Sequence, residues 1–206
     1  MFIYPEPNEK WESWWPRYRY GAFYIFPPTG VIEAVDALRA QYDPESARVC
    51  QAHLSLTEPL PAPLSDTQLA EIKNVLAMVK PFTLTYDELI TFPRSAKEGD
   101  EKHNGFAYDI EPKDLFWQLR NALHATSVFH GVKSKYRIEP HMTIAEMNCP
   151  WEKGRKLADE LQDVVPKGQF LCDRIEYAIP NDAFIFERKL TLQLGQGLAP
   201  NYSFSQ

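Results

Sequence analysis

The strings His53-Leu54-Ser55-Leu56 and His141-Met142-Thr143-Ile144 repeat one pattern of histidine, apolar residue, hydroxyl residue and apolar residue. In an extended strand, alternate side chains point to the same face. Each string is therefore expected to direct a histidine and a hydroxyl to one face and two apolar side chains into a core. Two such faces together supply two proton-transfer groups and two hydroxyl donors, which is the set that opens a phosphate ester without a metal.

The segments around the two strings follow the same order of strand, helix, motif strand, helix and strand. Hydrophobic periodicity predicts the first set over 18–26, 29–42, 52–57, 65–79 and 82–86. It predicts the second set over 104–110, 112–123, 140–146, 151–165 and 169–178, with a last strand over 183–194. The spacing from Gly21 to Gly105 nearly equals the spacing from His53 to His141, which indicates an internal duplication.

These strings, the second of them extended to Pro140-His141-Met142-Thr143-Ile144-Ala145, resemble the motifs of the 2H phosphoesterase superfamily. That superfamily includes the bacterial 2′-5′ RNA ligase-like proteins and cyclic phosphodiesterases. The resemblance implies an α+β, bilobal fold in which two pseudo-symmetric repeats of antiparallel sheet backed by helices surround a central cleft. We expect one domain over 1–206, with repeats at about 18–92 and 104–194, a short N-terminal extension and a loose C-terminal tail.

The resemblance also implies a role for each motif side chain. One histidine, His53 or His141, would take a proton from the attacking water or hydroxyl, and the other would protonate the leaving ribose oxygen. Imidazoles suit both roles because a pKa near 6.5 lets one ring be neutral and the other charged near neutral pH. Ser55 and Thr143 would donate hydrogen bonds to phosphate oxygens, each contributing about 3 kcal/mol. No metal or cofactor is implied, and the sequence leaves open which histidine is the acid.

The predicted function is metal-independent hydrolysis or transfer at a cyclic or 2′-5′ phosphodiester of a nucleotide or an RNA end. Three alternatives stay open: a non-catalytic nucleotide-binding module, a metal-dependent phosphohydrolase and a 2′-5′ RNA ligase. Metal ligation by His53 and His141 is disfavoured because no third ligand lies at a recognisable spacing. A purely structural role is disfavoured because the two histidines occupy matching positions of the duplication.

Several other residues are weaker candidates. Tyr18, Tyr20 and Tyr24 alternate along the first predicted strand, where core packing competes with base stacking as their role. Arg137 precedes the second string and is a candidate for neutralising phosphate, together with Lys133 and Lys135. Glu58 brings an acidic group close to the expected anion site. The remaining histidines match no motif, which favours structural or solvated roles for His103, His124 and His130.

The amino-acid composition indicates which class of partner the protein binds and in which compartment it is found. A net charge of −6 disfavours broad binding to long duplex nucleic acid, so we expect a small nucleotide or RNA end as substrate. Three scattered cysteines, at positions 50, 149 and 172, suit reduced thiols in a cytoplasmic protein. Neither a signal peptide nor a membrane span is predicted, because no long apolar run occurs. We expect a monomer.

Overall fold

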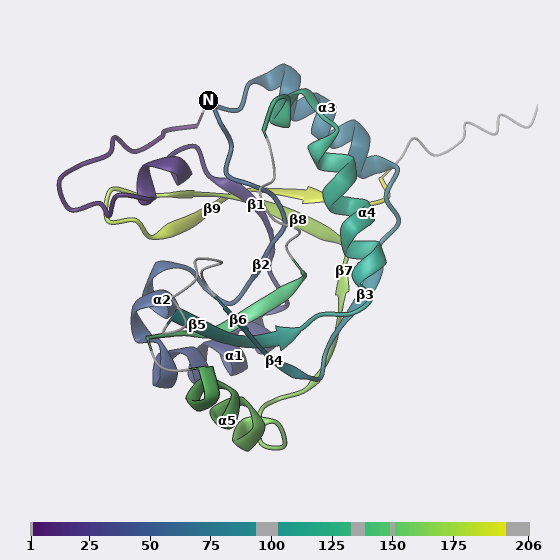
Figure 1. Ribbon diagram of the computed structural model, residues 1–206. Helices are drawn as coiled ribbons and strands as arrows, with labels where there is room; N and C mark the ends of the chain where they lie inside the picture. Colours follow the sequence, from purple (N-terminus) through teal and green to yellow (C-terminus); the bar gives the residue numbers. More distant parts are fainter. Residues whose placement is uncertain (1, 94–102, 133–138, 149–150, 197–206) are drawn as a thin grey trace, which may run out of the picture.

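The computed structural model describes residues 2–93, 103–132, 139–148 and 151–196. Two antiparallel sheets form the two lobes seen in Figure 1. The first has the order β2-β1-β8-β9, with bounds Leu54–Ser55, Ala22–Ile25, Arg174–Pro180 and Phe186–Gln193. The second has the order β4-β5-β6, with bounds Leu89–Pro93, His103–Asp109 and His141–Asn148. A two-stranded sheet of β3 (Phe82–Tyr86) and β7 (Gly168–Cys172) connects them at one side.

The helices are exchanged between the two lobes. Helix α1 (Thr29–Tyr42) follows β1 in the chain but packs against β6 of the other sheet, beside the short helix α2 (Pro44–Val49). Helix α4 (Lys113–His124) follows β5 but packs against α3 (Asp66–Ala77), which contacts β9. Helix α5 (Trp151–Leu161) covers β4 and β5. Each lobe is therefore built from both halves of the sequence, and this α+β, bilobal arrangement agrees with the expected fold class.

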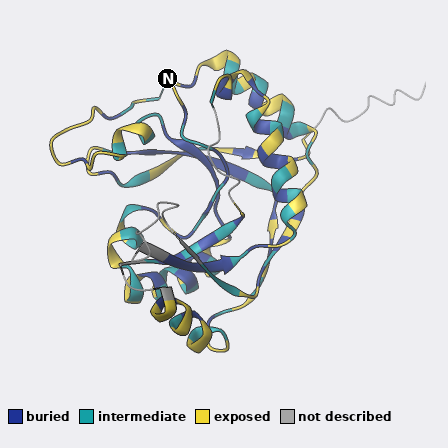
Figure 2. Cartoon of the chain, in the orientation of Figure 1, coloured by how far each residue is buried: buried dark blue, intermediate teal, exposed yellow. Residues whose placement is uncertain are grey.

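Local signals in the sequence explain where several elements begin. Ser65 and Gln68 form the capping box that starts α3: the Ser65 hydroxyl accepts from the Gln68 backbone N–H at 3.3 Å. Pro112 directly precedes α4, where a missing N–H costs no helical hydrogen bond. Ile72 and Leu76 of α3 and Leu119 and Leu123 of α4 are buried at helical spacing. These apolar stripes join the core that Figure 2 shows between helices and sheets.

Two predicted strands were too long. The strand expected over 18–26 begins only at Ala22, because the 3₁₀ helix η1 (Trp15–Tyr18) occupies the preceding residues and ends in a tight turn. Gly21 makes that turn with φ of 74°, and a Cβ there would lie 2.3 Å from the Ala178 carbonyl oxygen. The strand expected over 169–178 is two strands, β7 and β8, which separate at Asp173 and enter different sheets.

Candidate functional site

The two motif strands lie at facing sheet edges. Strand β2 is the edge of the four-stranded sheet, β6 is the edge of the three-stranded sheet, and the two strands contact each other. Figure 1 shows both of them at the junction of the lobes. Pairing with β1 continues past the C-terminal end of β2, since Leu56 donates its backbone N–H to the Phe23 carbonyl at 3.1 Å. The fold thus brings two segments that are far apart in sequence into one place.

The side chains of both strings alternate between the buried core and the partly exposed face of each strand. The four apolar members are all fully buried, namely Leu54, Leu56, Met142 and Ile144. The histidine and hydroxyl members are only half-buried, namely His53, Ser55, His141 and Thr143. This alternation confirms the expected direction of the two faces.

Both histidines are oriented by the same backbone contact. His53 Nδ1 lies 2.6 Å from the Gln51 carbonyl oxygen, and His141 Nδ1 lies 2.7 Å from the Glu139 carbonyl oxygen. A carbonyl only accepts, so each Nδ1 must carry a proton and donate it. In the neutral ring this leaves Nε2 as the basic nitrogen. In their neutral forms the two motif histidines therefore have the same tautomer, as expected for equivalent positions of two pseudo-symmetric repeats.

The surroundings of His53 are aromatic and cationic. Its ring meets Tyr24 edge-on at 4.9 Å between centroids and lies 5.9 Å from the ring of Phe26. Burial, together with the positive charges of Arg39 and His141, lowers the pKa of His53 to about 4, while the hydrogen bond to the Gln51 carbonyl acts in the opposite direction. The contact between strands β2 and β6 brings the segments that carry the two imidazoles side by side.

The surroundings of His141 include a carboxylate. Asp109 of β5 is its partner in the antiparallel β5–β6 ladder, so the two side chains lie on the same face. Burial lowers the pKa of His141, whereas the Glu139 carbonyl and the Asp109 charge raise it. The carboxylate thus favours the protonated form of this ring.

Glu58 is neutralised by arginines. Arg120 of α4 is buried and donates from Nη1 to the Leu56 carbonyl at 2.6 Å and from Nη2 to Glu58 Oε1 at 3.3 Å. Arg17 Nη2 lies 3.7 Å from Glu58 Oε2. The two arginines offset the negative charge of Glu58. They therefore weaken its repulsion of an anion bound near the first motif. Arg120 also ties α4 to the end of the first motif, a role that sequence reasoning missed.

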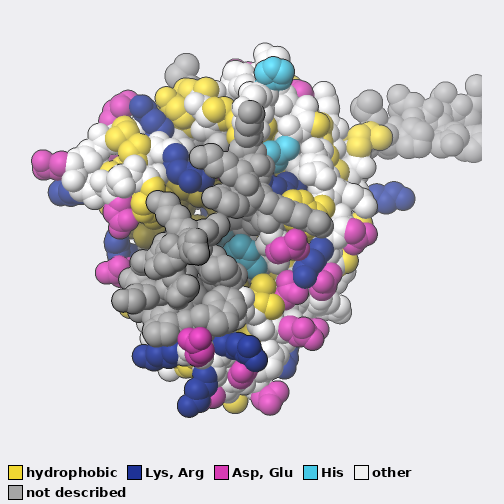
Figure 3. Space-filling view, viewed as in Figure 1, with side chains coloured by type: hydrophobic (Ala, Val, Ile, Leu, Met, Phe, Trp, Pro, Cys, Tyr) yellow, Lys and Arg dark blue, Asp and Glu magenta, His cyan; other side chains and the backbone are white. Residues whose placement is uncertain are grey.

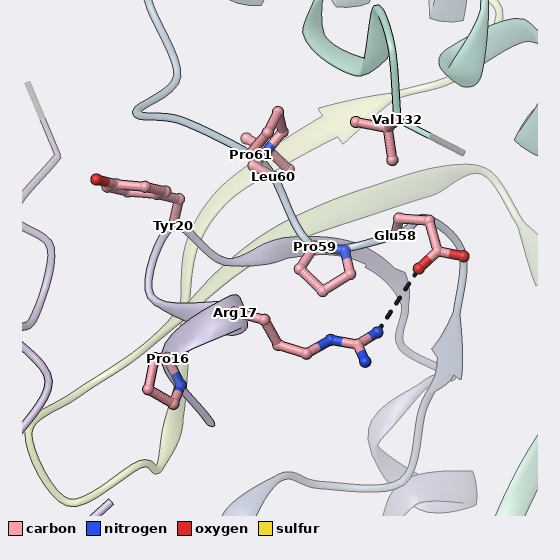
Figure 4. Close-up of a pocket in the computed structure, with 8 residues that line it drawn as sticks. All are labelled: Pro16, Arg17, Tyr20, Glu58, Pro59, Leu60, Pro61 and Val132. Atoms are coloured by element: carbon pink, nitrogen blue, oxygen red, sulfur yellow. Dashed lines mark ion pairs between the residues drawn. The ribbon is translucent and has the colours of Figure 1, made fainter. Parts of the chain in front are cut away.

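Only one of the proposed substrate-contact tyrosines lies beside a motif histidine. Tyr24, which is buried, contacts His53 as described. Tyr20 instead lines a cavity of about 350 Å³, and Figure 4 shows its ring directed away from Glu58. The cavity contains neither motif histidine and is lined by Pro16, Arg17, Tyr20, Glu58, Pro59, Leu60, Pro61 and Val132. Arg137, Lys133, Lys135 and Cys149 lie outside the described residues.

The described surface has mixed charge on the face shown in Figure 3, where lysine and arginine side chains are interspersed with aspartate and glutamate.

Among the described residues, no three His, Cys, Asp or Glu side chains are grouped as a metal-ligand set. In the same parts of the chain, no helix has the length and apolar character needed to span a membrane.

Residues 27–181 match the family model of the 2′-5′ RNA ligase superfamily. The chain belongs to this superfamily. It is thereby a member of the 2H phosphoesterase superfamily. No curated protein matches the sequence of this 2H phosphoesterase-family chain.

Solved structures share the fold of this 2′-5′ RNA ligase superfamily member at low sequence identity. Escherichia coli LigT complexed with 3′-AMP is 18% identical, with a TM-score of 0.54, 85% of this chain covered and 97% of that chain. TT0787 of Thermus thermophilus is 15% identical, with a TM-score of 0.53 and coverages of 86% and 98%. LigT complexed with NADP⁺ is 16% identical, with a TM-score of 0.52 and coverages of 85% and 96%.

Proposed function

We propose that this protein is a metal-independent phosphodiesterase that opens a 2′,3′-cyclic or 2′-5′ phosphodiester of a nucleotide or RNA end. The observation that carries this proposal is the matched orientation of the two motif histidines on contacting strands. Each ring donates from Nδ1 to a carbonyl two residues earlier and keeps Nε2 for proton transfer. A pair of such rings in one site suits a reaction that needs a base at the attacking oxygen and an acid at the leaving oxygen.

In this proposal the hydroxyls of Ser55 and Thr143 hold the phosphate. Each lies on the same face of its strand as the motif histidine, because the two residues are separated by one buried position. A hydroxyl donates one hydrogen bond, so the two side chains together can donate to two non-bridging phosphate oxygens. Negative charge develops on those oxygens as the nucleophile adds to phosphorus, and preorganised donors stabilise it.

The proposed substrate is small. The net charge of −6 and the mixed charge of the described side chains on the face in Figure 3 disfavour broad binding to a long duplex. The related LigT structures are complexes with 3′-AMP and with NADP⁺, which are both nucleotides. We extend that class of ligand to this chain and place its phosphate between β2 and β6.

Hydrolysis of a cyclic nucleotide is the reaction to test first. We expect the protein to convert one or more of the four nucleoside 2′,3′-cyclic monophosphates, or a 2′-5′-linked dinucleotide, at a rate that excess EDTA changes by less than about twofold. The physical reason is that two imidazoles supply the acid and the base without a metal. Mass spectrometry would follow the addition of one water, and the position of the product phosphate would be read by chromatography.

The His53→Ala protein, purified in parallel, is the blank for contaminating nucleases in this assay. Loss of turnover on adding EDTA, with recovery on adding a divalent metal, would instead identify a metal-dependent phosphohydrolase. Tight calorimetric binding of the same nucleotides with no product after hours would identify a binding module. Joining of RNA ends that carry a 2′,3′-cyclic phosphate and a 5′-hydroxyl would identify the ligase.

A further inference from the structure

The cavity of about 350 Å³ drawn in Figure 4 begins just beyond the first motif. One of its walls is the segment 58–61, which starts three residues after Ser55. Another wall comes from the segment 16–20, which contains most of η1. This second segment lies outside the residues 27–181 that match the superfamily model. The cavity therefore joins the end of a motif strand to a part of the chain that the family match does not include.

The N-terminal wall of the cavity is fixed by aromatic packing. Trp11 donates from Nε1 to the Asp182 carbonyl at 2.9 Å, and the ring of Trp15 is stacked on that of Phe184 at 4.1 Å between centroids. Phe184 is 1% exposed and lies in the turn between β8 and β9. The segment that contains η1 is therefore held against the four-stranded sheet, the sheet to which β2 belongs.

A run of aromatic contacts connects this wall with His53. The ring of Tyr18 lies 5.9 Å from that of Phe186, Phe186 lies 5.7 Å from Tyr24, and Tyr24 lies 4.9 Å from His53. The guanidinium of Arg17 lies 5.1 Å from the centre of the Tyr18 ring. The segment that supplies Arg17 to the cavity therefore packs against the same aromatic group as the first motif histidine.

The position of the cavity suits the base of a nucleotide whose phosphate is held at Ser55. Three residues of chain span at most about 11 Å, so the Glu58 backbone lies within that distance of the Ser55 backbone. In a nucleotide the ribose separates the phosphate from the base. A ribose that bridges this gap would bring its base to the cavity.

The lining of the cavity combines apolar walls with one charged edge. The apolar members are Pro16, Pro59, Leu60, Pro61 and Val132. At the charged edge, Arg17 Nη2 lies 3.7 Å from Glu58 Oε2, as the dashed line in Figure 4 shows. Small-molecule sites typically have this composition, in which apolar walls contact the ligand and a few polar groups fix its orientation. A nucleobase fits it, because its ring faces are apolar and its edge carries donors and acceptors.

The Glu58 carboxylate is held in place from behind. Arg120, which is 3% exposed, donates from Nη2 to Glu58 Oε1 at 3.3 Å. The backbone N–H of Glu58 donates to Nε2 of His124 on the same helix, at 3.4 Å. A carboxylate has about four acceptor sites, so it can bond to Arg120 and also accept from a ligand. The group at the charged edge is thus a preorganised acceptor with a guanidinium beside it.

We propose that this cavity is a guanine subsite, in which N1–H and the N2 amino group of the base donate to the Glu58 carboxylate and Arg17 donates to O6. The inference rests on the proposed phosphodiesterase function and narrows its substrate class. Guanine has two adjacent donors next to an acceptor, which matches a carboxylate next to a guanidinium. Adenine and cytosine each carry one amino donor beside a ring nitrogen that only accepts, and uracil carries a single N–H between two carbonyls.

Binding of the four nucleoside 3′-monophosphates, measured by calorimetry, tests the subsite without any turnover. We expect the guanosine nucleotide to bind roughly 5- to 100-fold more tightly than the other three. Glu58→Gln should bring this ratio to within about twofold of unity, because an amide offers one acceptor and sets its own donor against those of the base. A general weakening of the site would leave the ratio between bases unchanged.

Two arginine variants extend the binding test. Arg17 is 57% exposed, so Arg17→Gln should fold, and it should lower the guanine ratio by removing the donor to O6. Arg174→Gln is the matched control, since it removes the same charge at the start of β8 from a residue that does not line the cavity. Equal binding of all four nucleotides to the wild type, preference for another base, or a guanine ratio that survives Glu58→Gln would overturn the proposal.

Turnover separates this inference from the proposed function. The ratio of kcat/KM for guanosine to that for uridine 2′,3′-cyclic phosphate should be roughly 5- to 100-fold in the wild type and near unity in Glu58→Gln. Turnover with no preference among bases would refute the guanine subsite and leave the phosphodiesterase function standing. Guanine-selective binding with no turnover of any cyclic nucleotide or 2′-5′-linked dinucleotide would refute the phosphodiesterase function and leave the subsite standing.

Discussion

Replacing His53 or His141 by alanine is expected to lower kcat/KM for a 2′,3′-cyclic nucleotide by about 10²- to 10⁴-fold. Each imidazole is held by its Nδ1 hydrogen bond so that Nε2 is the nitrogen available for proton transfer. Removing one ring leaves either the nucleophile without a base or the leaving oxygen without an acid. Initial rates at substrate concentrations well below KM measure the effect directly.

A third histidine provides the control for this prediction. His130 is exposed and lies just beyond the 3₁₀ helix η2 (Ser127–Phe129), so His130→Ala should retain wild-type kcat/KM. Circular dichroism and the thermal midpoint would establish that each variant is folded. The account is contradicted if a folded His53→Ala or His141→Ala protein retains wild-type turnover.

Removing a motif hydroxyl is expected to cost about 10²- to 10³-fold in kcat. The relevant variants are Ser55→Ala and Thr143→Val, which delete a donor aimed at the phosphate while keeping the strand. The loss should fall on kcat more than on KM, because the hydrogen bond strengthens as charge develops in the transition state.

Two substitutions separate the hydroxyl from the shape of the side chain. Ser55→Thr keeps the donor and should retain activity within about tenfold of the wild type, since the position is half-buried rather than packed in the core. Thr83→Val removes a hydroxyl from the exposed face of β3 and should have no effect on turnover. If Thr143→Val changes kcat no more than Thr83→Val does, the phosphate is held by other groups.

The motif strands were predictable because the pattern that specifies them lies within four consecutive residues. Alternation of apolar and polar residues with period two specified which side chains of 53–56 and 141–144 are buried, and the structure confirms it. The alternation rule failed over 18–26. The first residues of this segment are aromatic, as is typical of strands, but in the structure they belong to the end of η1 and to the turn at Gly21. Strand β4 and helix α2 were missed because each is short, and because β4 ends at a proline while α2 begins at one.

The surroundings of the site were not predictable in the same way. A charged residue on a helix is usually solvated, and nothing local marks Arg39 or Arg120 as buried beside the motifs. Their burial follows from the exchange of helices between lobes, which depends on long-range packing rather than on periodicity. Asp109 became informative only through its register with His141. Sequence therefore identified the candidate reacting groups, whereas the fold supplied the charges that distinguish them.

A crystal structure with a nucleoside and vanadate bound would test most directly whether both imidazoles serve one phosphorus atom. We predict a five-coordinate vanadate between β2 and β6, with Nε2 of His53 and Nε2 of His141 each within about 3.2 Å of a different oxygen. The hydroxyls of Ser55 and Thr143 should lie within about 3.1 Å of the equatorial oxygens. Vanadate bound by a single histidine, or held in the cavity beside Arg17, would contradict the account.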